Sequence, residues 1–188
     1  DHRDLHSFPT RRSSDLYANT PLTFEDAALL MKAGVNNREV NLNAMGNTPQ
    51  VVLDAEKVTL DKIQYSDNGK IAYFIEDADI KAAKKACKEA GYQQEGKDAV
   101  KGVCGRLPEI EGVEVGFKVA EFGGAAALSI RSRSFDVSEI ARQYGGGGHK
   151  NAAAFQIPKN GRTTEQTVQD FIKELAPKIE AFEKAQNK

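Results

Sequence analysis

The stretch SIRSRSFDVSEIARQYGGGGHKNAAAF, residues 129 to 155, decides how this chain is expected to fold. Its first residues alternate as in a strand, and Ser134 or Asp136 can then cap a helix of about residues 137 to 144. That helix runs directly into four glycines, after which the apolar run AAAF follows. The segment therefore predicts a strand, a helix, a glycine loop and a second strand in immediate succession.

Two hairpins are predicted before this stretch. The first turns at DNGK, residues 67 to 70, because Asn-Gly between alternating segments is a strong hairpin signal. The second covers residues 112 to 132 and turns at Gly123-Gly124. Residues 95 to 109 remain ambiguous between helix and strand.

Helices are predicted on both sides of the first hairpin. Thr23 offers an N-cap for a helix over residues 24 to 33, and residues 37 to 60 indicate two short helices leading into a linker. A further helix begins at Asp77 or Asp79 and ends at Gly91. Its apolar side includes Cys87, which is therefore expected to be packed.

The end of the chain predicts a strand and a helix. Phe155 and Ile157 alternate as in a strand, PKNG turns the chain, and Thr163 or Thr164 opens a helix. Pro177 is expected to kink or divide that helix and to leave a polar, frayed tail. Together these elements predict an α+β fold, a mixed β-sheet with flanking helices.

Composition limits the classes of function. The 188 residues are 40% hydrophobic, and 26 Lys and Arg stand against 27 Asp and Glu, so no global positive charge attracts nucleic acid or anionic lipid. Neither a membrane span nor a signal peptide is predicted, which makes the cytoplasm the expected location. Cys87 and Cys104 stand too far apart for a metal motif and are expected to be free thiols.

The first sixteen residues differ in character from the rest. DHRDLHSFPTRRSSDL has no periodicity, holds two of the three histidines, and resembles one reading frame of a sequencing adapter. We therefore interpret residues 1 to 16 as a disordered artefact, although a natural basic arm is the alternative. If residues 1 to 16 are an artefact, the chain from Tyr17 onward is expected to be a fragment that lacks an upstream part.

The glycine run is the first candidate site. A flexible linker is the plain alternative, but these glycines join a capped helix to an apolar segment that must rejoin the core. Glycine-rich turns ahead of a helical turn direct unpaired N–H groups outward, which suits a phosphate. Gly146, Gly147 and Gly148 are accordingly expected to lie against an anion.

Three cationic or polar side chains join the glycines in the candidate site. His149 and Lys150 place hydrogen-bond donors at the end of the loop, although a lone histidine is often structural. Arg131 is a candidate phosphate clamp and shares a face with Arg133 if the strand continues that far, the alternative being a solvated charge. No second histidine or carboxylate cluster stands at metal-ligand spacing.

These same residues resemble the DHH-associated C-terminal domain of DHH-family phosphoesterases, with its pattern S-x-R-S, D-V-S-x-I-A and G-G-G-H-x-x-A-A-G-F. Roughly residues 62 to 185 fit that domain. Upstream, YANTPLTFEDAALLMKAGVN is similar to the end of the catalytic domain in the oligoribonuclease and adenosine bisphosphate phosphatase subgroup. The expected organisation is a catalytic-domain remnant with linker helices over residues 17 to 60 and the substrate-binding domain over residues 61 to 188.

The resemblance implies a function divided between two halves of a longer protein. Arg131 and Ser132, with the glycines and His149, would hold the phosphate and terminal nucleoside of a short single-stranded RNA or DNA or of a nucleoside phosphate. Two divalent metals, usually manganese, would act in a missing N-terminal catalytic domain, so this chain is expected to bind without cleaving and to hold no cofactor itself. Ala154 departs from the family pattern, which has glycine there, and this puts affinity and substrate choice in question.

Three rival functions remain open at this point. The first is the C-terminal domain of a cyclic-dinucleotide phosphodiesterase, which looks similar. The second is an RNA-binding module of the kind appended to alanyl-tRNA synthetases. The third is a scaffold or oligomerisation domain with no ligand at the glycines, and a homodimer is left open in every case. Residues 17 to 60 are expected to expose apolar surface that would otherwise pack on the missing half.

Overall fold

The computed structural model describes residues 20–45, 48–92 and 99–186, so the adapter-like residues 1–16 lie outside the described residues. By their contacts the residues divide into two parts, 1–50 and 51–188. This division falls earlier than the predicted boundary between residues 60 and 61, because α3 (Gln50–Leu60) buries Val52 and Ala55 against Cys87 and Ala99 of the second part. The catalytic-domain origin of residues 17–60 stays a prediction.

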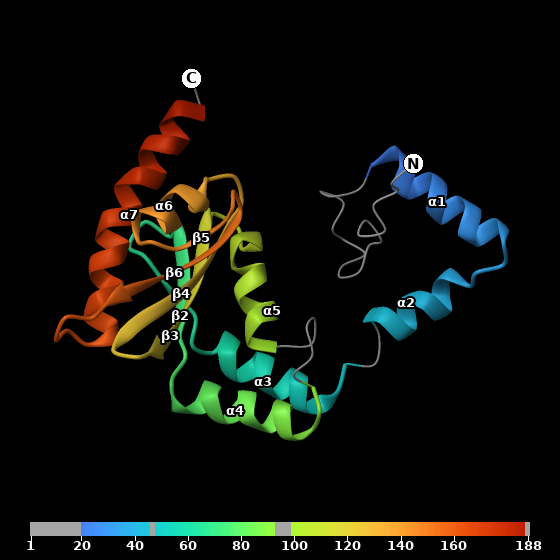
Figure 1. Cartoon of the computed structure of the whole chain (residues 1–188), viewed down its shortest axis with the longest axis horizontal. Helices are drawn as coiled ribbons and strands as arrows, with labels where there is room; N and C mark the ends of the chain where they lie inside the picture. The colour runs from blue at the N-terminus through green and yellow to red at the C-terminus, as the bar shows by residue number, and fades with distance from the viewer. Residues whose placement is uncertain (1–19, 46–47, 93–98, 187–188) are drawn as a thin grey trace. The chain divides into compact units, whose positions relative to one another are not determined.

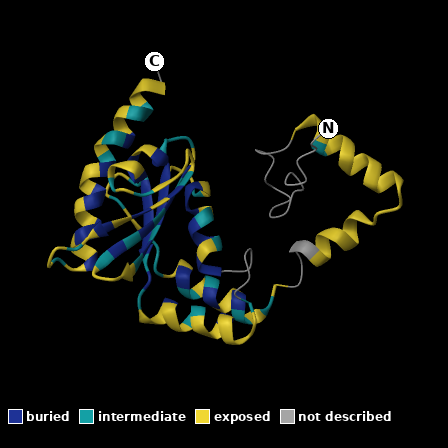
Figure 2. Ribbon diagram, viewed as in Figure 1, coloured by how far each residue is buried: buried dark blue, intermediate teal, exposed yellow. Residues whose placement is uncertain are grey.

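The first part contains two exposed helices, α1 (Pro21–Lys32) and α2 (Asn37–Met45). The N-cap of α1 is Thr20, not the predicted Thr23, because Thr23 serves as the N3 partner in a capping box and Pro21 occupies the first turn. No residue of α1 is buried (Figure 2). Leu22 and Phe24 are 67% and 59% exposed, which confirms the apolar surface expected here.

The second part is built on one six-stranded sheet with the order β1-β2-β3-β4-β6-β5. Its strands are β1 (Gln64–Tyr65), β2 (Ile71–Ile75), β3 (Val115–Phe122), β4 (Ala125–Ser132), β5 (Gly147–His149) and β6 (Ala152–Pro158). Only β2 and β3 run parallel, and the other neighbours are antiparallel. The predicted mixed sheet and both predicted hairpins are confirmed, and Gly123 and Gly124 both have positive φ, as a tight two-residue turn requires.

Five helical segments flank the sheet: α4 (Ala78–Glu89), α5 (Ala99–Arg106), the 3-10 helix η3 (Leu107–Glu109), α6 (Val137–Gln143) and α7 (Thr164–Gln186). Two of these helices begin at caps that the sequence predicted, since Asp77 caps α4 and Asp136 caps α6. Thr163 and Gln166 bond each other's backbone N–H groups at the start of α7. The ambiguous segment is helical in its described part, where it forms α5 and η3.

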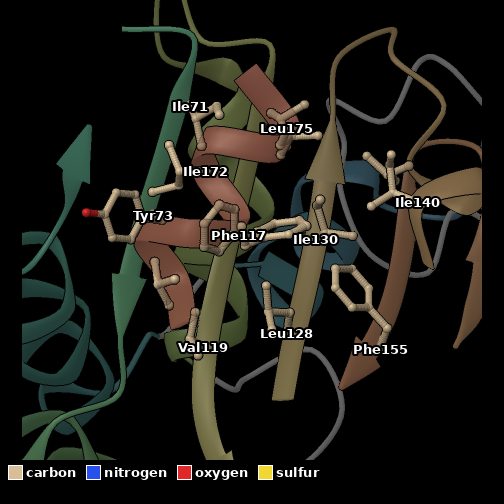
Figure 3. Close-up of a cluster of buried hydrophobic side chains, with 14 of the residues drawn as sticks. Ile71, Tyr73, Phe117, Val119, Leu128, Ile130, Ile140, Phe155, Ile172 and Leu175 are labelled. Atoms are coloured by element: carbon tan, nitrogen blue, oxygen red, sulfur yellow. The ribbon is translucent and has the colours of Figure 1, made fainter. Parts of the chain in front are cut away.

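The main core lies between one face of the sheet and the helices α6 and α7 (Figures 1 and 3). Alternate residues of four strands point into it, which is the period-two pattern of a sheet covered on that side. The strand residues that form this face are Ile71, Tyr73, Val115, Phe117, Val119, Ala126, Leu128, Ile130, Ala153, Phe155 and Ile157. Phe171 of α7 contacts Phe117 and Phe155 edge to face, so the helix is anchored at the centre of the core.

The last helix does not break at Pro177, contrary to prediction. α7 continues to Gln186, because Pro177 lies on its exposed side while Leu175 and Ile179 are buried on the other. The expected frayed tail is also wrong within the described residues. Glu180 and Glu183 accept hydrogen bonds from Asn68 and Lys70 of the first hairpin, and these bonds fasten the end of the helix.

The opposite face of the sheet is only partly covered. α5 packs on β3 and β4 (Figure 1), and η3 packs on β2, β3 and β4. Val103 and Leu107 are buried in one cluster with Phe74. Leu107 sits so close to Gly116 that a Cβ on the glycine would come within 2.3 Å of it. On β6 the alternation is buried and exposed, so its residues on this second face, such as Ala154, remain open to solvent.

Both cysteines behave as the sequence predicted. Cys87 and Cys104 form no disulfide with each other and are buried, and Cys87 packs in the small cluster that holds α3. Burial raises the pKa of the Cys104 thiol, while the charge of Arg131 acts in the opposite direction. The predictions that Cys87 is packed and that the two cysteines are not bridged are therefore confirmed.

A buried carboxylate ties the end of β2 to two other elements. Glu76, which is 4% exposed, accepts hydrogen bonds from Lys84 of α4 at 2.7 Å and from Lys118 of β3 at 2.5 Å. Burial opposes ionisation of Glu76, but the two lysines outweigh it, and the pKa of this carboxyl lies below its ordinary value. The charged pairings thus stabilise the folded state.

We expect Glu76→Gln to lower the free energy of unfolding by about 1–3 kcal/mol at pH 7, since both lysines lose their shared anion. Because the folded pKa is below the unfolded one, this stabilisation is present above the ordinary glutamate pKa and is lost as the pH falls through the folded value. Urea unfolding at pH 7 and at pH 4 should therefore show a smaller drop in the variant. Glu89→Gln, which removes an exposed i,i+4 pair with Lys85, serves as the control. An equal pH dependence in Glu76→Gln and the wild type would contradict this account.

Candidate functional site on the open sheet face

Two predicted site residues lie in one row across the open face of the sheet. Arg131 of β4 is paired with Ala152 of β6, and Ala152 is paired with His149 of β5. Residues directly opposite each other in a sheet point their side chains to the same side, so the side chains of Arg131 and His149 lie on the same face of the sheet. Two strand spacings separate their Cα atoms by about 9–10 Å, a gap wide enough for a phosphate group.

The neighbouring row forms a floor of small residues. Ser129, Ala154 and Gly147 are consecutive partners across β4, β6 and β5. Ala154 and Gly147 are exposed, whereas Ser129 is half-buried and its carbonyl accepts a hydrogen bond from Cys104 Sγ of α5 at 3.4 Å. The methyl group of Ala154, where the family pattern has glycine, therefore points to the open face beside the candidate phosphate row.

The guanidinium of Arg131 is available to a ligand. Arg131 is half-buried, and its Nη1 donates to the carbonyl of Ile130 at 2.8 Å. Within the described ranges, that is the one hydrogen bond of this guanidinium, and no carboxylate pairs with it there. A guanidinium has five N–H donors, so most of its capacity to bind a phosphate in bidentate fashion remains unused.

Different structural features account for the glycine at each of positions 145 to 148. Gly145 has a φ of 71°, which favours glycine after a helix end. Gly146 and Gly148 lie against β6, where an added Cβ would come within 2.2 Å and 2.4 Å of the carbonyl oxygens of Ala154 and Ala152. Gly147 has an ordinary negative φ and nothing within 4 Å of its Cβ direction. Packing explains Gly146 and Gly148 and the positive φ explains Gly145, so only Gly147 is left for approach by a ligand.

The glycine segment differs from the expected loop in one respect. Gly147–His149 is an edge strand, β5, paired antiparallel with β6, and Lys150 and Asn151 form the turn between them. No helical turn follows the glycines, so the predicted nest of amides ahead of a helix does not form. The outer backbone groups of an edge strand still have no strand neighbour, and these are the amides that could meet an anion.

Ser132 and Arg133 do not lie on the open face. Ser132 follows Arg131 in the strand, so its side chain points to the opposite side, where it is 8% exposed and donates its hydroxyl to Phe135 O at 2.5 Å. Arg133 shares no face with Arg131, because β4 ends at Ser132 and Arg133 instead donates Nε and Nη2 to Pro108 O. Ligand binding by Ser132 remains a prediction.

Lys150 is exposed at the tip of the hairpin and its carbonyl accepts a hydrogen bond from Val137 N at 2.9 Å.

Sequence reasoning overlooked Ser129, although its position two residues before Arg131 places both on one face of a strand. It also overlooked Asn151, whose role depends on contacts that no sequence pattern shows.

The described residues offer no group of three or more His, Cys, Asp and Glu side chains that could hold a metal ion. The two divalent metals that the resemblance implies therefore have no matching donor set in residues 20–45, 48–92 and 99–186. In the same ranges, no helix is long and apolar enough to cross a membrane.

Known proteins resemble this one over most of its chain. A solved structure of an exopolyphosphatase-related protein from Bacteroides fragilis superimposes with a TM-score of 0.63 at 17% identity, over 85% of this chain and 44% of that one. An uncharacterized protein of Mycoplasma pneumoniae is 31% identical over 143 residues, which is 74% of this chain and 40% of that protein. Its Mycoplasma genitalium counterpart is 28% identical over 158 residues, or 81% and 44%.

The chain thus spans less than half the length of these curated relatives. The DHHA1 domain model matches residues 68–181, from the first hairpin turn into α7. This range contains the whole open face, with Arg131, the glycine segment and His149. Since the match takes in well over half of the chain, the protein belongs to the DHHA1 domain family, the DHH-family-associated domains.

Proposed function

We propose that residues 61–188 bind the phosphorylated end of a short single-stranded oligonucleotide or of a nucleoside phosphate. The observation that carries this proposal is the row of Arg131 and His149 beside small residues, on a sheet face that α5 and η3 cover over β4 but that is exposed at Ala154, Gly147 and His149. An arginine with unused donors, an exposed imidazole and edge-strand amides together offer hydrogen bonds to the oxygens of one phosphate.

The local arrangement of side chains favours binding of an anion, even though the whole chain carries a formal net charge of −1. Two buried carboxylates in the described part of the fold already have hydrogen-bond partners. Glu76 is held by Lys84 and Lys118, and Glu114 accepts the backbone N–H groups of Ser134 and Phe135. The half-buried Arg131 has no carboxylate partner among the described residues, which favours a phosphate ligand.

Short ligands fit this arrangement better than long ones. A site that holds a terminal phosphate gains no further contact from a longer strand, and internal phosphodiesters lack the terminal oxygens. In the longer protein we place hydrolysis of short oligoribonucleotides or nucleoside bisphosphates in a separate catalytic domain that uses two divalent metals. The residues described here would then act only by holding the other end of the substrate.

The test is binding of a 5′-phosphorylated RNA trinucleotide to the whole chain, followed by fluorescence anisotropy. We expect saturable binding that weakens by about three- to sevenfold between 50 and 200 mM salt, as one or two phosphate contacts imply. The same trinucleotide without the 5′-phosphate should bind at least about tenfold more weakly, since a charge-assisted pair contributes about 1.5–3 kcal/mol. Added Mn²⁺ should produce no cleavage.

Competition separates the rival functions. A linear dinucleotide with a 5′-phosphate should displace the probe, whereas a cyclic dinucleotide has no terminal phosphate and should not. Equal binding of the phosphorylated and unphosphorylated trinucleotides would contradict end recognition and favour a general RNA-binding module. A folded chain that binds neither would favour the scaffold function.

A further inference from the structure

The β5–β6 hairpin has a turn that its own backbone does not favour. Only Lys150 and Asn151 separate the paired residues His149 and Ala152. Two-residue hairpins prefer turns that need positive φ at one or both central residues, and neither Lys150 nor Asn151 has a positive φ. The hairpin that carries His149 therefore depends on bonds to other elements for its conformation.

Lys150 O accepts one such bond from Val137 N of α6 at 2.9 Å, and the others come from Asn151 and reach the end of β4. Its side-chain Nδ2 donates to Ser132 O and Ser132 Oγ, both at 3.3 Å, and to Arg133 O at 3.0 Å. Its backbone carbonyl accepts from Ser132 N at 3.2 Å. A single exposed asparagine thus connects the hairpin turn to the residues that directly follow Arg131.

Ser132 is the buried end of this connection. Its hydroxyl receives the Asn151 bond and donates its own proton to Phe135 O, so it links β4 both to the hairpin and to the start of α6. The side chain lies on the face opposite to Arg131, away from the candidate phosphate. These contacts give Ser132 a task other than touching a ligand.

We propose that Ser132 and Asn151 are positioning residues that hold Arg131 and His149 in register across the open sheet face. This inference rests on the proposed phosphate-binding function and departs from the ligand contact that the family resemblance implies for Ser132. Arg131 is adjacent in sequence to one member of the pair, and His149 is two residues from the other. Loss of the connection leaves the side chains of Arg131 and His149 in the chain, and the pairing of β6 with β4 persists, but the turn and β5 become free to shift relative to β4.

A double-mutant cycle tests the proposal with the phosphorylated trinucleotide as probe. We expect Ser132→Ala and Asn151→Ala each to weaken binding by about three- to tenfold, and the loss in the double variant to be smaller than the two single losses combined, since both variants remove the bond from Asn151 Nδ2 to Ser132 Oγ. Arg131→Ala should also lose less affinity in the Asn151→Ala background than in the wild type. Additive losses, or an unaffected Asn151→Ala, would overturn the proposal and return Ser132 to direct contact.

Asn68→Ala is the matched control. Asn68 is also an asparagine in a hairpin turn with a side-chain bond to another element, Glu180 of α7, but it lies at the opposite edge of the sheet. Its loss should leave affinity within twofold of the wild type. Thermal unfolding of every variant checks that the fold persists, and the exposed Asn151 remains testable if Ser132→Ala fails to fold.

Hydrogen exchange makes the proposal testable without any ligand. In Asn151→Ala, the amides that join β5 and β6 should exchange at least about threefold faster than in the wild type, while those joining β3 and β4 keep their rates. Unchanged exchange at β5 would refute the positioning role. A wild type that fails to bind phosphate contradicts the proposed function, whereas exchange decides the positioning role separately.

Discussion

Replacing Arg131 by alanine is expected to weaken binding of the 5′-phosphorylated trinucleotide by about 10- to 100-fold. A charge-assisted hydrogen bond contributes about 1.5–3 kcal/mol, and each 1.4 kcal/mol corresponds to tenfold in affinity. Arg131→Lys should recover only part of this loss, because an ammonium cannot form the bidentate pair that a guanidinium makes with phosphate. The fold should persist, since the side chain bonds only the carbonyl of Ile130 within the described residues.

Anisotropy titrations at several salt concentrations check this prediction. The slope of log affinity against log salt should fall by about 0.7 in Arg131→Ala, the value for one lost phosphate contact on a single strand. Arg106→Ala is the control for charge alone, since Arg106 is exposed on α5 and lies near Glu56. We expect it to change affinity less than twofold at 150 mM salt, where exposed charges are screened. Equal losses in both variants would show that binding follows net charge and not the open face.

The second large effect is expected at neighbouring glycines. Gly146→Ala should lower the free energy of unfolding by about 1–3 kcal/mol, because its Cβ would overlap the Ala154 carbonyl and the Phe155 side chain. Gly147→Ala should unfold within about 0.5 kcal/mol of the wild type, as its Cβ meets nothing within 4 Å and its φ is negative. The methyl group at residue 147 nevertheless enters the small-residue floor, so phosphate affinity should fall.

Urea unfolding and trinucleotide binding, measured on both variants, separate the two roles. Gly146→Ala is expected to lose stability first, and Gly147→Ala is expected to lose at least about threefold in affinity with its stability kept. If Gly147→Ala binds as the wild type does, the ligand does not approach this part of β5. If Gly146→Ala is as stable as the wild type, β5 does not lie as close to β6 as the structure places it.

Much of the local structure could be predicted from the sequence. Asp77, Asp136 and Thr163 each cap the helix that follows, and the Asn-Gly and Gly-Gly turns form the two predicted hairpins. These signals act over a few residues, between a side chain and the nearest backbone groups, so they do not depend on the rest of the fold. The predicted α+β class followed from the order of such elements.

The candidate site was predicted in part for the same reason. Alternation in β4 places Arg131 on a definite face, and His149 follows the glycines directly. The role of Ser132 was implied only by the family resemblance, whereas alternation in β4 places its side chain on the face opposite to Arg131. Its neighbour Arg133 was placed with Arg131 on the assumption of a longer strand, and the strand ends one residue too early.

Other features were decided only by tertiary structure. Pro177 does not end α7, because burial of Leu175 and Ile179 and the bonds of Glu180 and Glu183 to the first hairpin outweigh the proline's local effect. The need for glycine at positions 146 and 148 also comes from tertiary structure, because β6 lies beside them and leaves no room for a Cβ.

By itself, then, the sequence determined the caps, turns and strand faces of this protein, and with them the identity of Arg131 and His149 as candidate ligands. The tertiary structure alone decided that β6 lies between β4 and β5, which puts those two side chains in one row. It also decided that Asn151 reaches Ser132 across the end of the sheet. The physical reason is that local signals arise from neighbouring backbone and side-chain groups, whereas a row across three strands depends on pairings between segments far apart in the chain.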